Sequence, residues 1–361
     1  MELLYKPEWE QTKQNYLAWW AHEDFGRCAV HVTAPKKGVN LKPPSLPEKV
    51  EDRWLDFDYL IAMNEYKMKT TFYGGEAIPQ WNPGHPGIDG LFTYLGGNTT
   101  LDESTGWQWP LFPDGELIDH DYRKLTLQEN RWRKFGRDTR RLAVRESKGK
   151  CIPSNFGIGA CGDTLAALRG SKSLLYDVID CPEYVRDFDM HLMKFFEVVY
   201  DESYAITSEG AEGSTCWFPM WSPGKFYALQ NDFAYMISNK MFNEIFMPTI
   251  EMQTKYLDNS VYHLDGVENF RHKDSLLSLE RLQAYQIAPG AGKPNALYYM
   301  DILKKVQAHK RNLHIYLPPG EVKHALDQLS SRGLYIVTMC DTEDEACELL
   351  KNVEKWSVDR G

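Results

Sequence analysis

Short apolar runs alternate with amphipathic stretches along the second half of the chain. The runs are apolar throughout, as is typical of parallel strands covered on both faces, and they lie at 260–264, 284–287, 313–317 and 334–339. Most are followed by a stretch whose apolar positions have helical spacing. Alternation of strand and helix predicts a parallel α/β fold. About eight such units fit the length, so we predict one TIM-type (β/α)8 barrel over residues 1–361 rather than a doubly wound sheet.

The first half of the chain is less regular. A stretch with helical spacing at 7–23 precedes an apolar, β-rich run at 27–34, which predicts an extended N-terminal segment before the first strand. A polar, Trp-bearing stretch at 98–124 shows no clear period. We expect it to form a lid or a small hairpin over one end of the barrel, because loops of this length are often functional. Further on, the pattern predicts a helix at 182–200 and a strand-like segment within 207–220.

Charge and composition exclude several classes of protein. The chain has 41 Lys and Arg against 51 Asp and Glu, a net charge of -10, which argues against a nucleic-acid-binding protein. No apolar run approaches the ~18 residues needed to span a membrane. The N-terminus lacks the apolar core of a signal peptide, so we expect a cytoplasmic protein. The seven cysteines are odd in number and form no CxxC pair, which disfavours a disulfide framework.

Three residues at predicted strand ends are candidate metal ligands. His263 and Asp265 stand two apart in YHLDG, and Cys340 directly follows the last predicted strand in YIVTMC. Alternation along a strand points the first two side chains the same way, and chemistry in a barrel gathers where strands end. Imidazole, carboxylate and thiolate together would make a zinc site with one open position. Each residue taken alone is more often structural.

The last half of the chain resembles the uroporphyrinogen decarboxylase superfamily, closest to its zinc- and cobalamin-dependent methyltransferases. The similar stretches are GACGDTLAALRGSKSLLYDVIDCPEYV, LQNDFAYMISNKMFNEIFMPTIE, YHLDG, QIAPGAGKP and YIVTMC. The resemblance implies a barrel in which His263 and Cys340 bind zinc. Asp265 stands where the family has Cys, and Glu244 lies near an acidic position of the family. A carboxylate in place of a thiolate would make the zinc a stronger Lewis acid.

The same resemblance argues against a porphyrinogen decarboxylase. Those enzymes carry an Arg-rich loop of the form RQAGRY after the first strand, where this chain reads APKKGVNLKPP. Nor does the chain contain GxGxxG after a first strand or GxxxxGK[ST], so dinucleotide and P-loop sites lack their motifs.

Other polar and aromatic residues are expected around the same mouth. Glu209 and Glu212 in TSEGAEGS, with Asp232 after LQN, are candidate catalytic carboxylates. An acidic cavity with aromatic walls suits a methylated amine or a methoxylated ring. The candidate substrate-binding residues are Trp81, Trp217 and Trp221.

Together these features predict a methyltransferase. It would move a methyl group between a small methylated substrate, methoxylated aromatic or methylamine-like, and a corrinoid or thiol acceptor. The chain shows no cobalamin-binding domain of its own, so the corrinoid is expected on a separate protein. Two alternatives stay open: a barrel hydrolase or lyase acting on a sugar or aromatic acid through Glu209, Glu212 and Asp265, and a non-catalytic small-molecule binder. A homodimer is also open, since acidic barrels of this size often pair.

Overall fold

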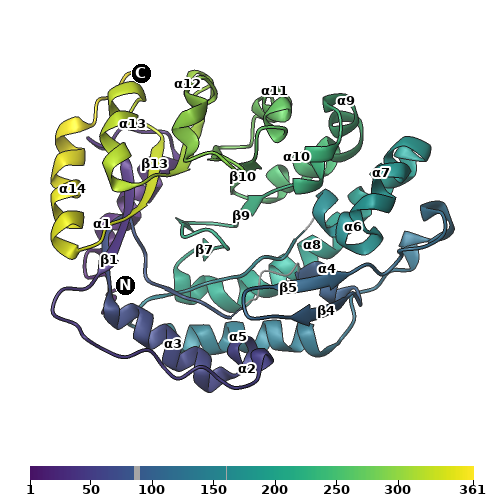
Figure 1. The fold of residues 1–361 in the computed structure, drawn as a ribbon, viewed down its shortest axis with the longest axis horizontal. Helices are drawn as coiled ribbons and strands as arrows, with labels where there is room; N and C mark the ends of the chain where they lie inside the picture. The colour runs from purple at the N-terminus through teal and green to yellow at the C-terminus, as the bar shows by residue number, and fades with distance from the viewer. Residues whose placement is uncertain (85–89, 160) are drawn as a thin grey trace.

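A mostly parallel sheet forms the centre of the molecule (Figure 1). The computed structural model describes residues 1–84, 90–159 and 161–361. Within them the sheet has seven strands in the order β2-β1-β13-β12-β11-β10-β9, and only β2 is antiparallel to its neighbour. The strands are β1 (Ala29–Pro35), β2 (Thr71–Gly75), β9 (Phe226–Leu229), β10 (Asn259–Asp265), β11 (Ala284–Ala288), β12 (Asn312–Tyr316) and β13 (Leu334–Met339).

Two pairs of two-residue strands lie outside this sheet. β3 (Gln80–Trp81) pairs with β6 (Ile152–Pro153), and β7 (Ser214–Thr215) pairs with β8 (Trp221–Ser222). A side chain joins β6 to β7, because the Thr215 hydroxyl donates to the Pro153 carbonyl over 3.2 Å. No ladder among the described strands links β3 and β6 to the main sheet. The α/β prediction is confirmed and a TIM-like fold is compatible, but closure into a (β/α)8 barrel is not shown.

Helices follow the strands and surround them, most regularly in the second half (Figure 1). None of the helices in the described part of the chain is long and apolar enough to cross a membrane. The longer ones are α1 (Trp9–Trp20), α3 (Phe57–Thr70), α5 (Arg131–Ser147), α6 (Cys161–Arg169), α7 (Ser171–Asp180), α8 (Pro182–Ala211), α10 (Met247–Tyr256), α12 (Met300–Ala308) and α14 (Glu343–Trp356).

Helix α8 corrects one sequence prediction. The strand-like segment expected within 207–220 begins inside this helix, which continues to Ala211. Thr207 has the β-branched side chain that favours a strand, but its hydroxyl donates to the Ser203 carbonyl over 3.0 Å, one helical turn back. That bond and the burial of the helix face outweigh the local preference. The helix ends at Glu212, which has a left-handed backbone.

Helix α1 covers the N-terminal ends of the strands. The Trp20 ring packs edge-on against Phe226 at the start of β9, with ring centroids 5.2 Å apart. The Asn312 amide at the start of β12 donates to the Trp19 carbonyl over 2.6 Å. The extended N-terminal segment therefore closes one end of the fold and leaves the C-terminal strand ends for a site.

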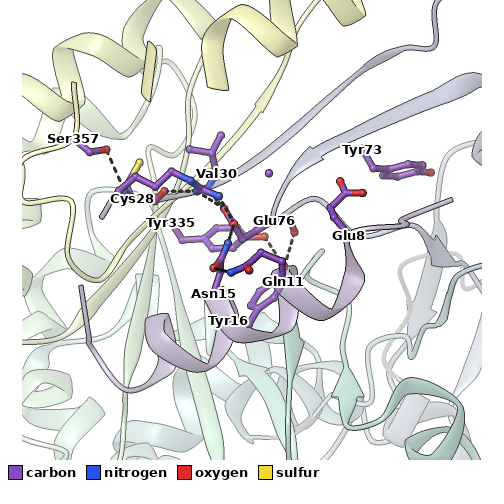
Figure 2. Close-up of polar contacts among 12 residues, drawn as sticks. Glu8, Gln11, Asn15, Tyr16, Cys28, Val30, Tyr73, Glu76, Tyr335 and Ser357 are labelled. Carbon is purple, nitrogen blue, oxygen red and sulfur yellow. Dashed lines mark hydrogen bonds and ion pairs between the residues drawn. The ribbon is translucent and has the colours of Figure 1, made fainter. Parts of the chain in front are cut away.

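A buried carboxylate fixes this closed end in place (Figure 2). Glu76 directly follows β2 and is 0% exposed. It accepts two hydrogen bonds from Arg27, of 2.8 and 2.7 Å, one from the Val30 amide of 2.6 Å and one from Asn15 of α1 of 2.8 Å. Burial alone would raise the pKa of Glu76, but the Arg27 guanidinium and the other donors hold it below its usual range. One side chain thus joins α1, β1 and β2.

Replacing Glu76→Gln should lower the free energy of unfolding by about 3–5 kcal/mol, because it leaves the Arg27 charge without its partner. Denaturant titration at pH 7 measures the loss. Asp344→Asn is the control, since it removes an exposed ion pair with Lys37 and should cause no measurable change. Equal stability of the two variants would contradict a structural role for the buried pair.

Candidate active site

A cavity of about 1030 Å³ lies where several strands end. Residues that follow β3, β6, β7 and β9 line it, among them Asn82, Asn155, Cys216 and Gln230. The C-terminal ends of parallel strands are where α/β barrels place their chemistry. Its volume is at the upper end of the range for small-molecule sites. We therefore take this cavity as the candidate active site.

Two aspartates line the cavity and share their surroundings. Asp163, in the first turn of α6, accepts hydrogen bonds from the Asp232 and Phe233 amides, of 2.7 and 3.1 Å, and from the Gln230 side chain, of 2.9 Å. Burial raises the pKa of Asp163 to about 7, and the charge of Asp232 adds to the rise. Burial also raises the pKa of Asp232 to about 6, with the charge of Asp265 adding. The pair therefore retains a proton close to neutral pH.

A third carboxyl group lies behind this pair. Asp189 of α8 is fully buried, and neither carboxyl oxygen has a hydrogen-bond partner among the described residues. Burial raises the pKa of Asp189 to about 8, with the nearby Thr249 hydroxyl opposing the rise and the Asp163 charge adding to it. Asp189 therefore retains its proton close to neutral pH, and a negative charge on Asp163 favours this protonated form.

Aromatic side chains form much of the cavity wall. Trp217, predicted from the sequence, lines the cavity and is 37% exposed, and its indole N–H donates to the Ala228 carbonyl over 3.1 Å. Trp107 lines it from the hairpin of β4 (Asn98–Leu101) and β5 (Gly106–Trp109), held by a 2.6 Å bond to Asp102. The expected excursion at 98–124 thus contributes to the cavity wall. Its role as a lid stays a prediction.

Two other predicted tryptophans belong to the core. Trp221 is buried, donates to the Ala211 carbonyl over 2.8 Å and packs edge-on against Trp9 with centroids 5.5 Å apart. Trp81 is buried in a separate apolar cluster with Leu60. Neither lines the cavity. Both lie on short strands, where the side chain pointing away from the cavity meets the packed helices.

The two glutamates that were expected to follow a strand lie at the end of α8 instead, because this helix continues to Ala211. Glu209 is exposed in its last turn, and Glu212 is the residue at which the helix ends and forms a 2.5 Å ion pair with Lys13. Neither lines the cavity. A catalytic role for these two residues stays a prediction that the cavity does not support, whereas Asp232 does lie in the cavity wall.

The expected zinc ligands do not come together. The His263 ring nitrogen Nδ1 is hydrogen-bonded to Gln286, and Glu244 is 63% exposed, 3.9 Å from Lys240. Cys340 is buried, and the acidic groups that act on it, Glu345 and Asp341, are at the start of α14. Burial raises the pKa of the Cys340 thiol, which disfavours the thiolate that zinc requires.

Strand geometry explains this outcome. Tyr335 of β13 faces His314 inside the fold, and alternation puts Cys340, five positions on, on the opposite, helix-covered face. In residues 1–84, 90–159 and 161–361, no three His, Cys, Asp or Glu side chains are grouped so that they could hold a metal ion. The residues present do not fit the expected site. Zinc stays a prediction of the resemblance.

Sequence reasoning missed Asp163 and Asp189. Asp163 stands in the first turn of a predicted helix, in GACGDTLAALRG, where an aspartate is usually a cap. Asp189 interrupts the buried face of α8 between Phe188 and Leu192, and a lone acid on an apolar face is a usable signal.

No protein-family model matches the chain, and no curated protein does. Among solved structures it is similar to a methyltransferase from Methanosarcina mazei, with a TM-score of 0.61 and 10% identity, over 95% of this chain and 98% of that one. The two proteins share a fold. Membership of the uroporphyrinogen decarboxylase superfamily stays a prediction.

Asp189→Asn should change how stability depends on pH. From about pH 4 to about 8 the folded state keeps a proton that the unfolded state has released, so Asp189 makes the wild type less stable as pH rises. The variant cannot titrate at this position. Its stability relative to wild type should therefore grow by up to about 1.4 kcal/mol per pH unit in this window.

Denaturant titrations between pH 5 and 8 test this. Asp187→Asn, at an exposed position of the same helix, is the matched control and should parallel the wild type. A pH-independent difference between Asp189→Asn and wild type would show that Asp189 is ionised in the folded protein.

Proposed function

We propose that the protein is a methyltransferase that removes a methyl group from a small methoxylated aromatic compound, with the Asp163–Asp232 pair as general acid. The observation that carries this proposal is a carboxyl pair with raised pKa values on the wall of an aromatic-lined cavity. The fold shared with a methyltransferase supports the reaction class. Trp107 and Trp217 would hold the ring by stacking.

The carboxyl pair supplies the proton that the leaving oxygen needs. An electron pair of the acceptor forms the new bond to the methyl carbon. The carbon–oxygen bond breaks with its electrons going to oxygen, and a carboxyl proton passes to that oxygen. The products are a phenol and the methylated acceptor. Without the proton, the leaving group would be a phenoxide in a partly buried cavity, which is costly.

The raised pKa values also favour an ether over a methylated ammonium substrate. A pair that retains a proton near neutral pH attracts a cation less than two carboxylates would.

The methyl acceptors to be tested are those that the sequence resemblance implies, a corrinoid on a separate protein and a thiol.

Paired carboxyl groups also suit the second candidate, a hydrolase acting on a sugar or aromatic acid. Glu209, Glu212 and Asp265 do not line the cavity, so the acid and base of this reaction would be Asp163 and Asp232. The two proposals differ in where the group goes, since hydrolysis releases it to water and methyl transfer produces a methylated acceptor.

Asp163→Asn and Asp232→Asn should each lower kcat for demethylation by about 10²–10⁴-fold, the usual contribution of a positioned acid. Wild-type activity should fall as pH rises above about 7, because the acid loses its proton. The assay follows phenol release and acceptor methylation from 4-methoxyphenol, with reduced cobalamin or a thiol as acceptor.

Glu212→Gln is the control and should keep full activity, because Glu212 lies outside the cavity. Unchanged activity in both aspartate variants would refute the acid role. Release of phenol without a methylated acceptor would refute the transferase proposal and support the hydrolase.

A further inference from the structure

A buried guanidinium without a counter-ion lies behind one wall of the cavity. Arg140 of α5 is 2% exposed and forms no ion pair among the described residues. Its Nε donates to the Asn155 side chain over 2.9 Å, and one terminal nitrogen donates to the Gly136 carbonyl over 2.8 Å. The other terminal nitrogen has no partner in the described structure. A buried charge in this state is unfavourable unless something neutralises it.

Arg140 contacts two residues that line the cavity, Asn155 and Phe156. The guanidinium carbon is 3.9 Å from the centroid of the Phe156 ring, and Phe156 and Asn155 line the cavity. The charge therefore acts on the cavity through one aromatic ring and one amide. In a partly buried space such a field is weakly screened and favours an anion.

A second cation lines the same cavity. Lys67 of α3 lines the cavity and forms no ion pair within the described residues. One turn earlier, Asn64 exchanges hydrogen bonds of 2.9 and 2.7 Å with the Asn82 backbone. Beside Arg140, Thr139 donates to the Pro83 carbonyl over 2.8 Å. The segment after β3 thus joins the helix of Lys67 to the helix of Arg140, and both cations act on one side of the cavity.

We propose that this wall, formed by Lys67, Asn155 and Phe156 with Arg140 behind it, binds the carboxylate of an aromatic acid. The substrate is then a methoxylated aromatic carboxylate, with its acid group beside Lys67 and its methoxy group at Asp163 and Asp232 of α6 and the segment after β9. Lys67 contacts the carboxylate. Arg140 is a positioning residue, because it acts through Asn155 and Phe156.

The methoxy end of this arrangement rests on the proposed function, whereas the carboxylate site does not. A single flexible ammonium beside amide groups suits a carboxylate on a flat ring, and the cavity has the aromatic surface to hold that ring.

Calorimetric titration of the full chain tests the proposal with two pairs of probes, 4-methoxybenzoate against 4-methoxybenzamide and benzoate against benzamide. The two members of each pair differ in charge but have nearly the same shape. The wild type should bind each acid about tenfold more tightly than its amide, the effect of one charge-assisted contact. Lys67→Met should remove most of this preference and leave binding of the amides unchanged.

Lys69→Met removes the same charge from the same helix at a position outside the cavity and should keep the preference. Arg140→Gln should lower the preference as Lys67→Met does. If that buried variant does not fold, Lys67→Met decides, because Lys67 is exposed. Equal or undetectable binding of acid and amide by the wild type overturns the proposal, as does equal loss in Lys67→Met and Lys69→Met.

The two proposals can fail separately. A preference for benzoate over benzamide with no methyl transfer to either acceptor would uphold the carboxylate site and refute the methyltransferase. Demethylation of 4-methoxyphenol without any preference for the acids would do the reverse.

Discussion

A charge buried in a protein is costly unless it is paired, and this molecule meets that constraint differently at its two ends. At the closed end, Glu76 is matched by Arg27, a backbone amide and an amide side chain, and this matching joins α1 to the edge of the sheet. Around the cavity the same constraint is left unmet. Asp189 and Arg140 are as deeply buried as Glu76, yet polar atoms of both lack partners in the described structure.

The proposed chemistry of the cavity follows from these unpaired buried groups. Carboxyl groups that cannot ionise freely become acids at neutral pH, and a guanidinium without a carboxylate favours an anion. In the proposed reaction Asp163 and Asp232 donate the proton on one side of the cavity, while Lys67 and Arg140 favour an anion on another side. Glu76 and its partners at the closed end do not line the cavity.

Much of the second half of the fold could be predicted from the sequence. The expected strands at 260–264, 284–287 and 334–339 differ from β10, β11 and β13 by at most one residue at each end. Apolar runs between helices are a strong signal because both faces of these strands are buried. In the first half β3 and β6 have two residues each, too few for any period, and α8 extends past its expected end through a side-chain bond at Thr207.

The site was only partly predictable. Asp232 and Trp217, which the sequence singled out because they follow strand ends, do line the cavity. The expected zinc ligands are not grouped in the described part of the chain. Cys340 continues the outward phase of β13, a property of strand register that the spacing from Asp265 does not reveal. Asp189 and Arg140 affect the cavity because they are buried. Their burial depends on which helices pack over them, and the sequence pattern does not give that packing. In the sequence both are single charged residues among many.

The central claim is that the cavity holds carboxylic acids that stay protonated close to neutral pH. A pH titration of the protein with ¹³C-labelled aspartate carboxyl groups, followed by NMR and assigned with Asp163→Asn and Asp232→Asn, measures this directly. The account predicts that these two carboxyl signals titrate near pH 7 and pH 6. Titration of both near about pH 4, the ordinary value for aspartate, would contradict it.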